Sequence, residues 1–229
     1  MSVFSGIQLP KTIYTTESKY NGKIEVMEIG KTRKIKVDKA TQSLNWDSPS
    51  AENLVWGKIV KTLKEEEPLL SSVLILGLGG GTIQHLISHI YPGIRIVSIE
   101  IDQVMEDIAK NYFDIGSIPN HQIIIEDACR VIVEPETYGL NVASFGAVIV
   151  DIYCGEKYPE LGKSGNFISA LKKMTVPGGL IIFNRMYHEP HQDDVNIFTE
   201  TVSEFLADVK QLIVAGYTNS DNILIYGRV

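Results

Sequence analysis

Three acidic residues and a glycine-rich stretch end short apolar runs of the sequence, and each could contact a nucleoside. The run at 73–77 ends in Gly77-Leu78-Gly79-Gly80-Gly81, and Glu100, Asp127 and Asp151 stand at the ends of three later runs. The carboxyl ends of parallel strands lie at the same edge of a sheet, which is where α/β proteins bind ligands. Glycines there let a ligand approach the backbone and expose N–H groups at the start of a helix.

The spacing of the acids indicates separate roles in nucleoside binding. Glu100 lies 19 residues after Gly81, where a carboxylate can accept hydrogen bonds from both hydroxyls of a ribose. Asp127 could accept from the exocyclic amine of an adenine, and Ala128 would keep that pocket small. The alternatives are a surface carboxylate for Glu100 and a helix cap for Asp127, while a helix cap is the favoured reading of Asp102. Together these residues predict an adenosine pocket.

The elements that would position these residues alternate between strands and helices. Apolar runs predict strands at 73–77, 94–99, 122–125, 147–150 and 180–184. Helical patterns follow at 82–90, 103–112, 128–134, 164–174 and 192–209, with a turn at 177–179. Alternation of this kind predicts a parallel sheet with helices on both faces. Two final strands, at 211–215 and 222–227, are joined by a link too short for a parallel crossover, so we expect them to be antiparallel.

The front of the chain has a different pattern. Residues 22–29 and 33–38 alternate apolar and polar side chains around a turn, which predicts a β-hairpin. Residues 1–20 show no clear period and predict an extended lead-in. A helix is expected to begin near 47–50, where Pro49 follows a polar cap candidate. We therefore predict an N-terminal β appendage over 1–48 and an α/β domain over 49–229.

Composition narrows the class of protein. The chain has 229 residues and a formal net charge of -7, from 28 acidic and 21 basic side chains, which disfavours nucleic acid as a partner. No apolar run approaches the ~20 residues of a membrane span, and the basic-then-apolar layout of a signal peptide is missing. The two cysteines, Cys129 and Cys154, match no metal or redox spacing. We expect a cytoplasmic protein with free thiols.

Taken together, the motifs resemble those of the S-adenosylmethionine-dependent methyltransferase superfamily. The resemblance covers about residues 50–229 and rests on the glycine-rich stretch, Glu100, Glu126-Asp127-Ala128 and Pro177-Gly178-Gly179. It implies a Rossmann-like seven-stranded sheet that ends in an antiparallel pair. A dinucleotide-binding fold is less suited, since it would favour glycine or alanine at the position of Thr82.

The front half adds a closer resemblance, to spermidine synthases. Asp38-Lys39-Ala40-Thr41-Gln42 looks like their aspartate–glycine–x–x–glutamine segment, and Asp151-Ile152-Tyr153-Cys154-Gly155 looks like their catalytic strand end. These aminopropyltransferases share the methyltransferase sheet, carry an N-terminal β domain and commonly form dimers or tetramers. The resemblance implies S-adenosylmethionine or its decarboxylated form as cofactor, and a possible homodimer. The implied cofactor-binding residues are Gln42, Gly77, Leu78, Gly79, Gly80, Gly81, Glu100, Ile101, Asp127, Ala128 and Asp151.

Three departures from the spermidine synthase pattern bear on the reaction. The family has an aspartate in the glycine loop at the position of Gly80, and that acid suits a cofactor without a carboxylate. The second acid of the family's active-site loop is replaced by Cys154. A polyamine needs anionic partners when it leaves water, so its determinants are incomplete here. The tyrosine–histidine pair expected after Gln42 is replaced by Ala51-Glu52.

Three functions remain open on the sequence. The leading hypothesis is methyl transfer from S-adenosylmethionine to a small molecule or a protein side chain. The second is aminopropyl transfer to make a polyamine, and the third is a nucleoside-binding protein without activity. In a transferase, Asp151 would orient an amine acceptor or take its proton. Tyr153 would stack on the acceptor or bond it, or else pack within its loop.

A metal site is not expected. The stretch His188-Glu189-Pro190-His191-Gln192-Asp193-Asp194 contains ligand types at irregular spacing, interrupted by a proline. A helix cap at Asp193 or Asp194 would explain part of it. His188 would instead line the acceptor side of the pocket, because its loop leaves the fifth strand at the ligand edge.

Overall fold

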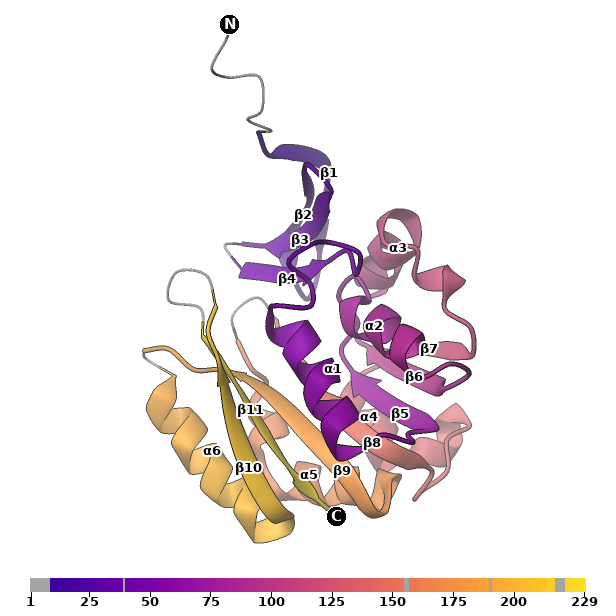
Figure 1. Ribbon diagram of the computed structural model, residues 1–229, viewed down its shortest axis with the longest axis vertical. Coiled ribbons are helices and arrows are strands. Elements are labelled where there is room, and N and C mark those ends of the chain that lie inside the picture. Colours follow the sequence, from indigo (N-terminus) through magenta and orange to yellow (C-terminus); the bar gives the residue numbers. More distant parts are fainter. Residues whose placement is uncertain (1–8, 39, 155–156, 190, 217–220) are drawn as a thin grey trace, which may run out of the picture.

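The chain forms two β-sheets, a large one covered by helices and a small one set over one end of it (Figure 1). The computed structural model describes residues 9–38, 40–154, 157–189, 191–216 and 221–229. The predicted fold class, a Rossmann-like seven-stranded sheet with helices on both faces after a small β unit, is confirmed. The proposed boundary at residue 48 stays a prediction.

The large sheet has seven strands in the order β10-β11-β9-β8-β5-β6-β7. Its strands are β5 Ser72–Leu76, β6 Arg95–Glu100, β7 His121–Ile125, β8 Phe145–Val150, β9 Thr175–Met186, β10 Ala207–Val214 and β11 Asn222–Arg228. Strands β5 to β9 are parallel, and β11 is antiparallel to both of its neighbours, as expected. From β5 the chain first builds outward through β6 and β7, then returns to place β8 on the other side of β5. This reversal of strand order opens a crevice between the ends of β5 and β8.

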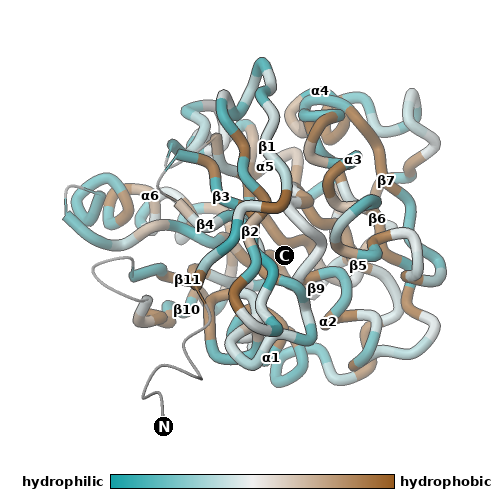
Figure 2. The backbone as a smooth tube through the Cα atoms, turned by 90° about the horizontal axis from the view of Figure 1, so that it is seen from above, coloured by the Kyte–Doolittle hydropathy of each residue, from teal (hydrophilic) through white to brown (hydrophobic). Residues whose placement is uncertain are grey.

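In the described part of the chain, six helices cover the two faces of this sheet. They are α1 Val55–Glu66, α2 Thr82–Ile90, α3 Gln103–Tyr112, α4 Ala128–Val133, α5 Gly165–Met174 and α6 Gln192–Phe205, with short 3₁₀ turns at Ile115–Ser117, Pro135–Tyr138 and Glu160–Lys163. Val73 and Ile75 of β5 pack toward α1 and α2, whereas Leu74 and Leu76 pack toward α4, α5 and α6. This alternation explains why the central strands are apolar throughout. Hydrophobic colour lies mainly inside the fold in Figure 2.

The small sheet has four antiparallel strands in the order β1-β2-β3-β4. They are β1 Lys11–Ser18, β2 Gly22–Ile29, β3 Thr32–Val37 and β4 Ala40–Leu44. The hairpin is confirmed, but the expected lead-in over 1–20 is wrong for the part that forms β1. That strand is a polar, largely exposed edge, so its sequence shows no alternation. The inner face of the hairpin packs on Met105 and Ile108 of α3, which fixes β4 above the crevice.

Several boundaries differ from those predicted. Helix α1 begins at Val55 because residues 48–54 form turns, and α6 ends at Phe205, so β10 begins earlier than expected. The predicted turn at 177–179 lies inside β9, where the pairing with β8 shifts register and Gly178 has a positive φ of 77°. A register shift of this kind is a β-bulge, and it allows a glycine with positive φ to remain within a strand. The first helical turn of α6 carries Asp194, but His191 is the N-cap residue.

Candidate active site

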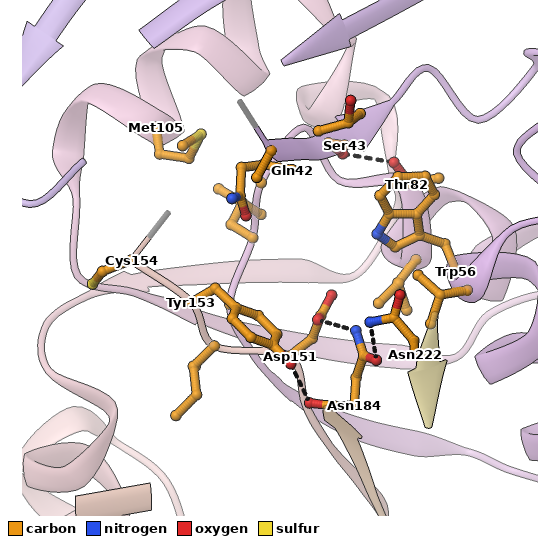
Figure 3. A pocket seen from close by; sticks show the side chains of 18 of the residues that line it. Gln42, Ser43, Trp56, Thr82, Met105, Asp151, Tyr153, Cys154, Asn184 and Asn222 are labelled. Carbon is orange, nitrogen blue, oxygen red and sulfur yellow. Dashed lines mark hydrogen bonds between the residues drawn. The ribbon is translucent and has the colours of Figure 1, made fainter. Parts of the chain in front are cut away.

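A cavity of about 910 Å³ lies at the carboxyl ends of the parallel strands, with β4 on its opposite side (Figure 3). It gathers most of the predicted site residues, namely Gln42, Gly77, Leu78, Gly79, Glu100, Ile101, Asp127, Ala128, Asp151 and Tyr153. Gly80 and Gly81 do not line it. The strand-end argument therefore brought together residues as far apart in the chain as Gly77 and Asp151, which are 74 positions apart.

Gly77 closes the floor of the cavity. Its φ is 101°, and a Cβ atom there would lie 2.1 Å from the carbonyl oxygen of Asp151. A side chain at this position is therefore excluded on two counts, space and backbone conformation. The glycine lets the chain that follows β5 pass closely against the backbone of Asp151, at the end of β8.

The environment of Gly80 differs from the one that the spermidine synthase resemblance implied. A Cβ atom on Gly80 would point at the Phe113 ring, at 2.9 Å, and at the Ser43 hydroxyl, at 3.1 Å. In this backbone, a side chain at position 80 would press on those groups rather than enter the cavity. The loop around Gly80 therefore has no room for the aspartate that the spermidine synthase resemblance implies at this position.

Glu100 is held by the backbone on both sides of its carboxylate. Oε2 accepts from the Leu78 N–H at 3.1 Å, and Oε1 accepts from the Asp102 N–H at 2.9 Å. Burial raises the pKa of Glu100 to about 7, and these backbone hydrogen bonds oppose the rise. Each carboxylate oxygen keeps a second lone pair, so the fixed carboxylate can still accept from two ribose hydroxyls.

Both neighbouring aspartates cap helices. Asp127 accepts from the Cys129 N–H at 2.8 Å at the start of α4, as its alternative reading predicted, and it also lines the cavity beside Ala128. Asp102 caps α3 through the Val104 N–H at 3.0 Å. Its other oxygen accepts from Asn21 at 2.7 Å. Asp102 therefore ties the turn of the β1–β2 hairpin to the adenosine side of the cavity.

Asp151 lies at the end of a short chain of amides. Asn184 Nδ2 donates to Asp151 Oδ1 at 2.7 Å, and Asn222 Nδ2 donates to Asn184 Oδ1 at 2.9 Å. Figure 3 shows the other Asp151 oxygen directed into the cavity. Burial raises the pKa of Asp151 to about 6, and the bond from Asn184 opposes the rise. Sequence reasoning missed both asparagines, although Asn184 ends a predicted strand and could have been found by the same argument as the acids.

The Tyr153 hydroxyl is bonded to the protein backbone and is therefore not available to an acceptor substrate. The hydroxyl donates to the Asn184 carbonyl at 3.0 Å and accepts from the Met186 N–H at 2.9 Å. Burial raises its pKa well above the usual range, so the phenol stays protonated. The ring, which lines the cavity, can still pack on an acceptor, and its catalytic assignment stays a prediction.

Thr82 docks the small sheet against the start of α2. In the sequence it was noted only as a departure from a dinucleotide-binding fold. Its buried hydroxyl lies 2.6 Å from the Ser43 hydroxyl, accepts from the Leu44 N–H at 3.2 Å and donates to the Leu44 carbonyl. These bonds join the start of α2 to β4. They hold Gln42, the residue before Ser43, at the cavity.

His188 lines the cavity, as predicted for the loop after β9. Among the described residues, no cluster of three or more histidine, cysteine, aspartate or glutamate side chains could hold a metal ion. Within the same residues, no helix combines the length and apolar character that crossing a membrane requires.

Comparison with known proteins gives relatives of two kinds. No family model matches the chain. A polyamine aminopropyltransferase of Vibrio vulnificus is 29% identical over 117 residues, which cover 51% of this chain and 38% of the relative. A homolog of the eEF1A lysine and N-terminal methyltransferase from Drosophila pseudoobscura is 24% identical over 162 residues, 67% of this chain and 24% of the relative. The chain thus spans well under half the length of either curated relative.

Solved structures agree on the fold. A spermidine synthase in complex with the transition-state analogue AdoDATO superposes with a TM-score of 0.76 at 15% identity, covering 95% of this chain and 73% of that one. Human Methyltransferase-like protein 13, in complex with SAH, gives a TM-score of 0.60 at 17% identity, over 78% and 81% of the two chains. The strand order, the antiparallel terminal pair and the N-terminal sheet give this chain the spermidine synthase-like form of the S-adenosylmethionine-dependent methyltransferase fold.

Proposed function

We propose that the protein is an S-adenosylmethionine-dependent transferase that methylates an amine. The observation that carries this proposal is the placement of Asp151, a half-buried carboxylate that lines the cavity and is oriented by Asn184, and whose backbone adjoins Gly77. The cavity also fits an adenosine. Glu100 offers two fixed acceptor oxygens, and Asp127 and Ala128 line the cavity at the next strand end.

The chain's own residues would bind the reactants, orient the acceptor and exclude water. The bound cofactor would supply an electrophilic carbon on a sulfonium centre. The free Asp151 oxygen can accept a hydrogen bond from a neutral amine and so align its lone pair. With a pKa raised to about 6, Asp151 is mostly ionised at neutral pH and is a better proton acceptor than an ordinary aspartate.

The charges of the cavity favour an acceptor with a single amine over a polyamine. Glu100, Glu126 and Asp127 lie at the ends of the strands that would hold the adenosine. Glu160 is paired with Lys163 at 2.9 Å. The position of the family's second acid is Cys154, whose pKa is raised by burial, so the thiol is uncharged at neutral pH. Among the described lining residues, Asp151 is then the acid that remains for the acceptor, and one carboxylate does not offset the cost of desolvating a polycation.

The second candidate is aminopropyl transfer from decarboxylated S-adenosylmethionine. It is favoured by the likeness to polyamine aminopropyltransferases and by Gln42, which lies at the cavity as the spermidine synthase resemblance implied. A nucleoside-binding protein without activity is the third candidate. The cytoplasmic location and the homodimer expected from the sequence stay predictions.

A transfer assay distinguishes these candidates. The full chain would be incubated with either cofactor and with a blocked lysine or putrescine as acceptor, and the products would be weighed by mass spectrometry. We expect the blocked lysine to gain a methyl group. An aminopropyl group on putrescine would favour the second candidate, and unchanged acceptors with a bound cofactor would favour the third.

A further inference from the structure

A second cavity, of about 490 Å³, adjoins the first on the side of α6. The two cavities share the walls formed by Tyr153, Cys154, Pro159, Glu160 and Met186. A molecule bound against Asp151 therefore has a continuous path of lining residues into the second cavity. No part of the proposed methyl transfer uses this space.

Arg185 is the central cation of the second cavity. It follows Asn184 on β9, and successive residues of a strand point to opposite faces, so Asn184 serves the first cavity and Arg185 the second. The guanidinium carbon lies 4.0 Å from the centre of the Tyr158 ring and 4.6 Å from that of Phe198, and the two ring centres are 6.2 Å apart. Its Nη2 donates to Asp194 at 2.7 Å. The group is thus fixed in place and only 3% exposed.

Two hydrogen-bond donors at this cavity are unmatched. Arg185 Nη1 and the Tyr158 hydroxyl are buried and have no hydrogen-bond partner among the residues that the structure describes. A buried donor without a partner costs about 1–3 kcal/mol, and more when it is charged. Both residues line this cavity, and a guanidinium N–H and a phenol hydroxyl are donors that suit a carboxylate.

The charge of the second cavity is opposite to that of the first. The second is lined by three cationic side chains, Lys157, Lys163 and Arg185, and by two carboxylates, Glu160 and Asp194. Lys163 binds both carboxylates, and Arg185 shares Asp194. Among the described residues, those lining the first cavity include one cation, Lys34, and five carboxylates. A cationic cavity is unexpected in a chain of net charge -7, and it indicates an anionic ligand.

We propose that the second cavity binds a carboxylate carried by the acceptor, through Arg185 and the Tyr158 hydroxyl. The proposal rests on the proposed function for the acceptor's other end, where the amine meets Asp151. The acceptor class is then an amine that also bears an acid. Tyr153, which lines both cavities, stands between the two ends and would pack on the linking carbons.

A binding experiment tests this inference without any transfer. γ-Aminobutyrate and its uncharged amide, γ-aminobutyramide, would each be titrated calorimetrically into the full chain. We expect the acid to bind at least about tenfold more tightly than the amide. Arg185→Met should remove this preference, and Tyr158→Phe should reduce it about threefold. Equal affinities for the two probes, or no binding of the acid, would overturn the proposal.

Two controls keep the result interpretable. Lys173→Met removes an exposed cation from α5, outside both cavities, and should leave the preference unchanged. Should Arg185→Met fail to fold, Tyr158→Phe decides, because it removes only an unpartnered oxygen. If the preference for the acid over the amide survives both Tyr158→Phe and Arg185→Met, the proposal is wrong. Arg185 would then serve to hold Tyr158 and α6 together. S-adenosylmethionine affinity, measured in parallel, tests the proposed function separately.

Discussion

Asn184 and Asp151 are joined by a 2.7 Å hydrogen bond across the ends of the neighbouring strands β9 and β8. The bond leaves one carboxylate oxygen for the cavity and fixes the direction in which it points. Asn222 in turn holds the Asn184 amide, so that its nitrogen faces Asp151. A carboxylate oriented in this way is prepared to receive an amine without first reorganising.

Replacement of Asp151 by asparagine separates binding from chemistry. Asp151→Asn keeps the size of the side chain and can keep the bond to Asn184, but it loses the charge and the proton acceptor. We expect turnover to be abolished, while calorimetric affinity for S-adenosylmethionine stays within a few-fold. Undiminished turnover would remove Asp151 from the mechanism.

Loss of the Asn184 amide should change the pH dependence of turnover. The hydrogen bond lowers the pKa of Asp151, against the burial that raises it to about 6. In Asn184→Ala the pKa rises further, so the acid limb of the pH–rate profile moves to higher pH. Asn196→Ala, on the exposed side of α6, should leave the profile unchanged. A reduced rate with an unmoved acid limb would mean that Asn184 only supports the fold.

Cofactor affinity should depend on the ionisation of Glu100. Its pKa is raised to about 7 in the free protein, and ribose hydroxyls donate to the ionised form, so binding lowers that pKa. Affinity is therefore highest above pH 7 and is lost as the pH falls, by up to about tenfold between pH ~8 and pH ~6. The titration is best made in Asp151→Asn, which removes the second titrating carboxylate. Glu100→Gln should bind more weakly and show a flat profile; an equally steep profile would assign the titration to another group.

Thr82 should matter for stability and for cofactor affinity together. Thr82→Val keeps the shape but leaves the Ser43 hydroxyl and both backbone groups of Leu44 without their partner. We expect the free energy of unfolding in urea to fall by about 1–3 kcal/mol, and cofactor affinity to fall because Gln42 is no longer held. Thr201→Val, which loses one bond on the surface of α6, is the matched control. A variant as stable as the control would show that the small sheet docks without these bonds.

The sequence predicted the part of the site that follows from strand order. Glu100, Asp127 and Asp151 could be placed on one edge because apolar runs identify parallel strands, and parallel strands end together. Asn184 was missed although it ends a predicted strand, whereas Asn222 was missed because its role is a contact with another side chain, which no pattern in the chain reveals. Strands β1 and β4 were missed because a polar strand shows no alternation against a core. Gly80 was predicted to depart from the spermidine synthase pattern, and the direction that a side chain would take there required the structure.

The most direct measurement compares the affinities of the full chain for S-adenosylmethionine and for its decarboxylated form by calorimetry. The glycine turn 77–81 carries no carboxylate that would repel the carboxylate of S-adenosylmethionine, so we expect this form to bind more tightly than the decarboxylated one. Tighter binding of the decarboxylated form would contradict methyl transfer and assign the cavity to aminopropyl transfer.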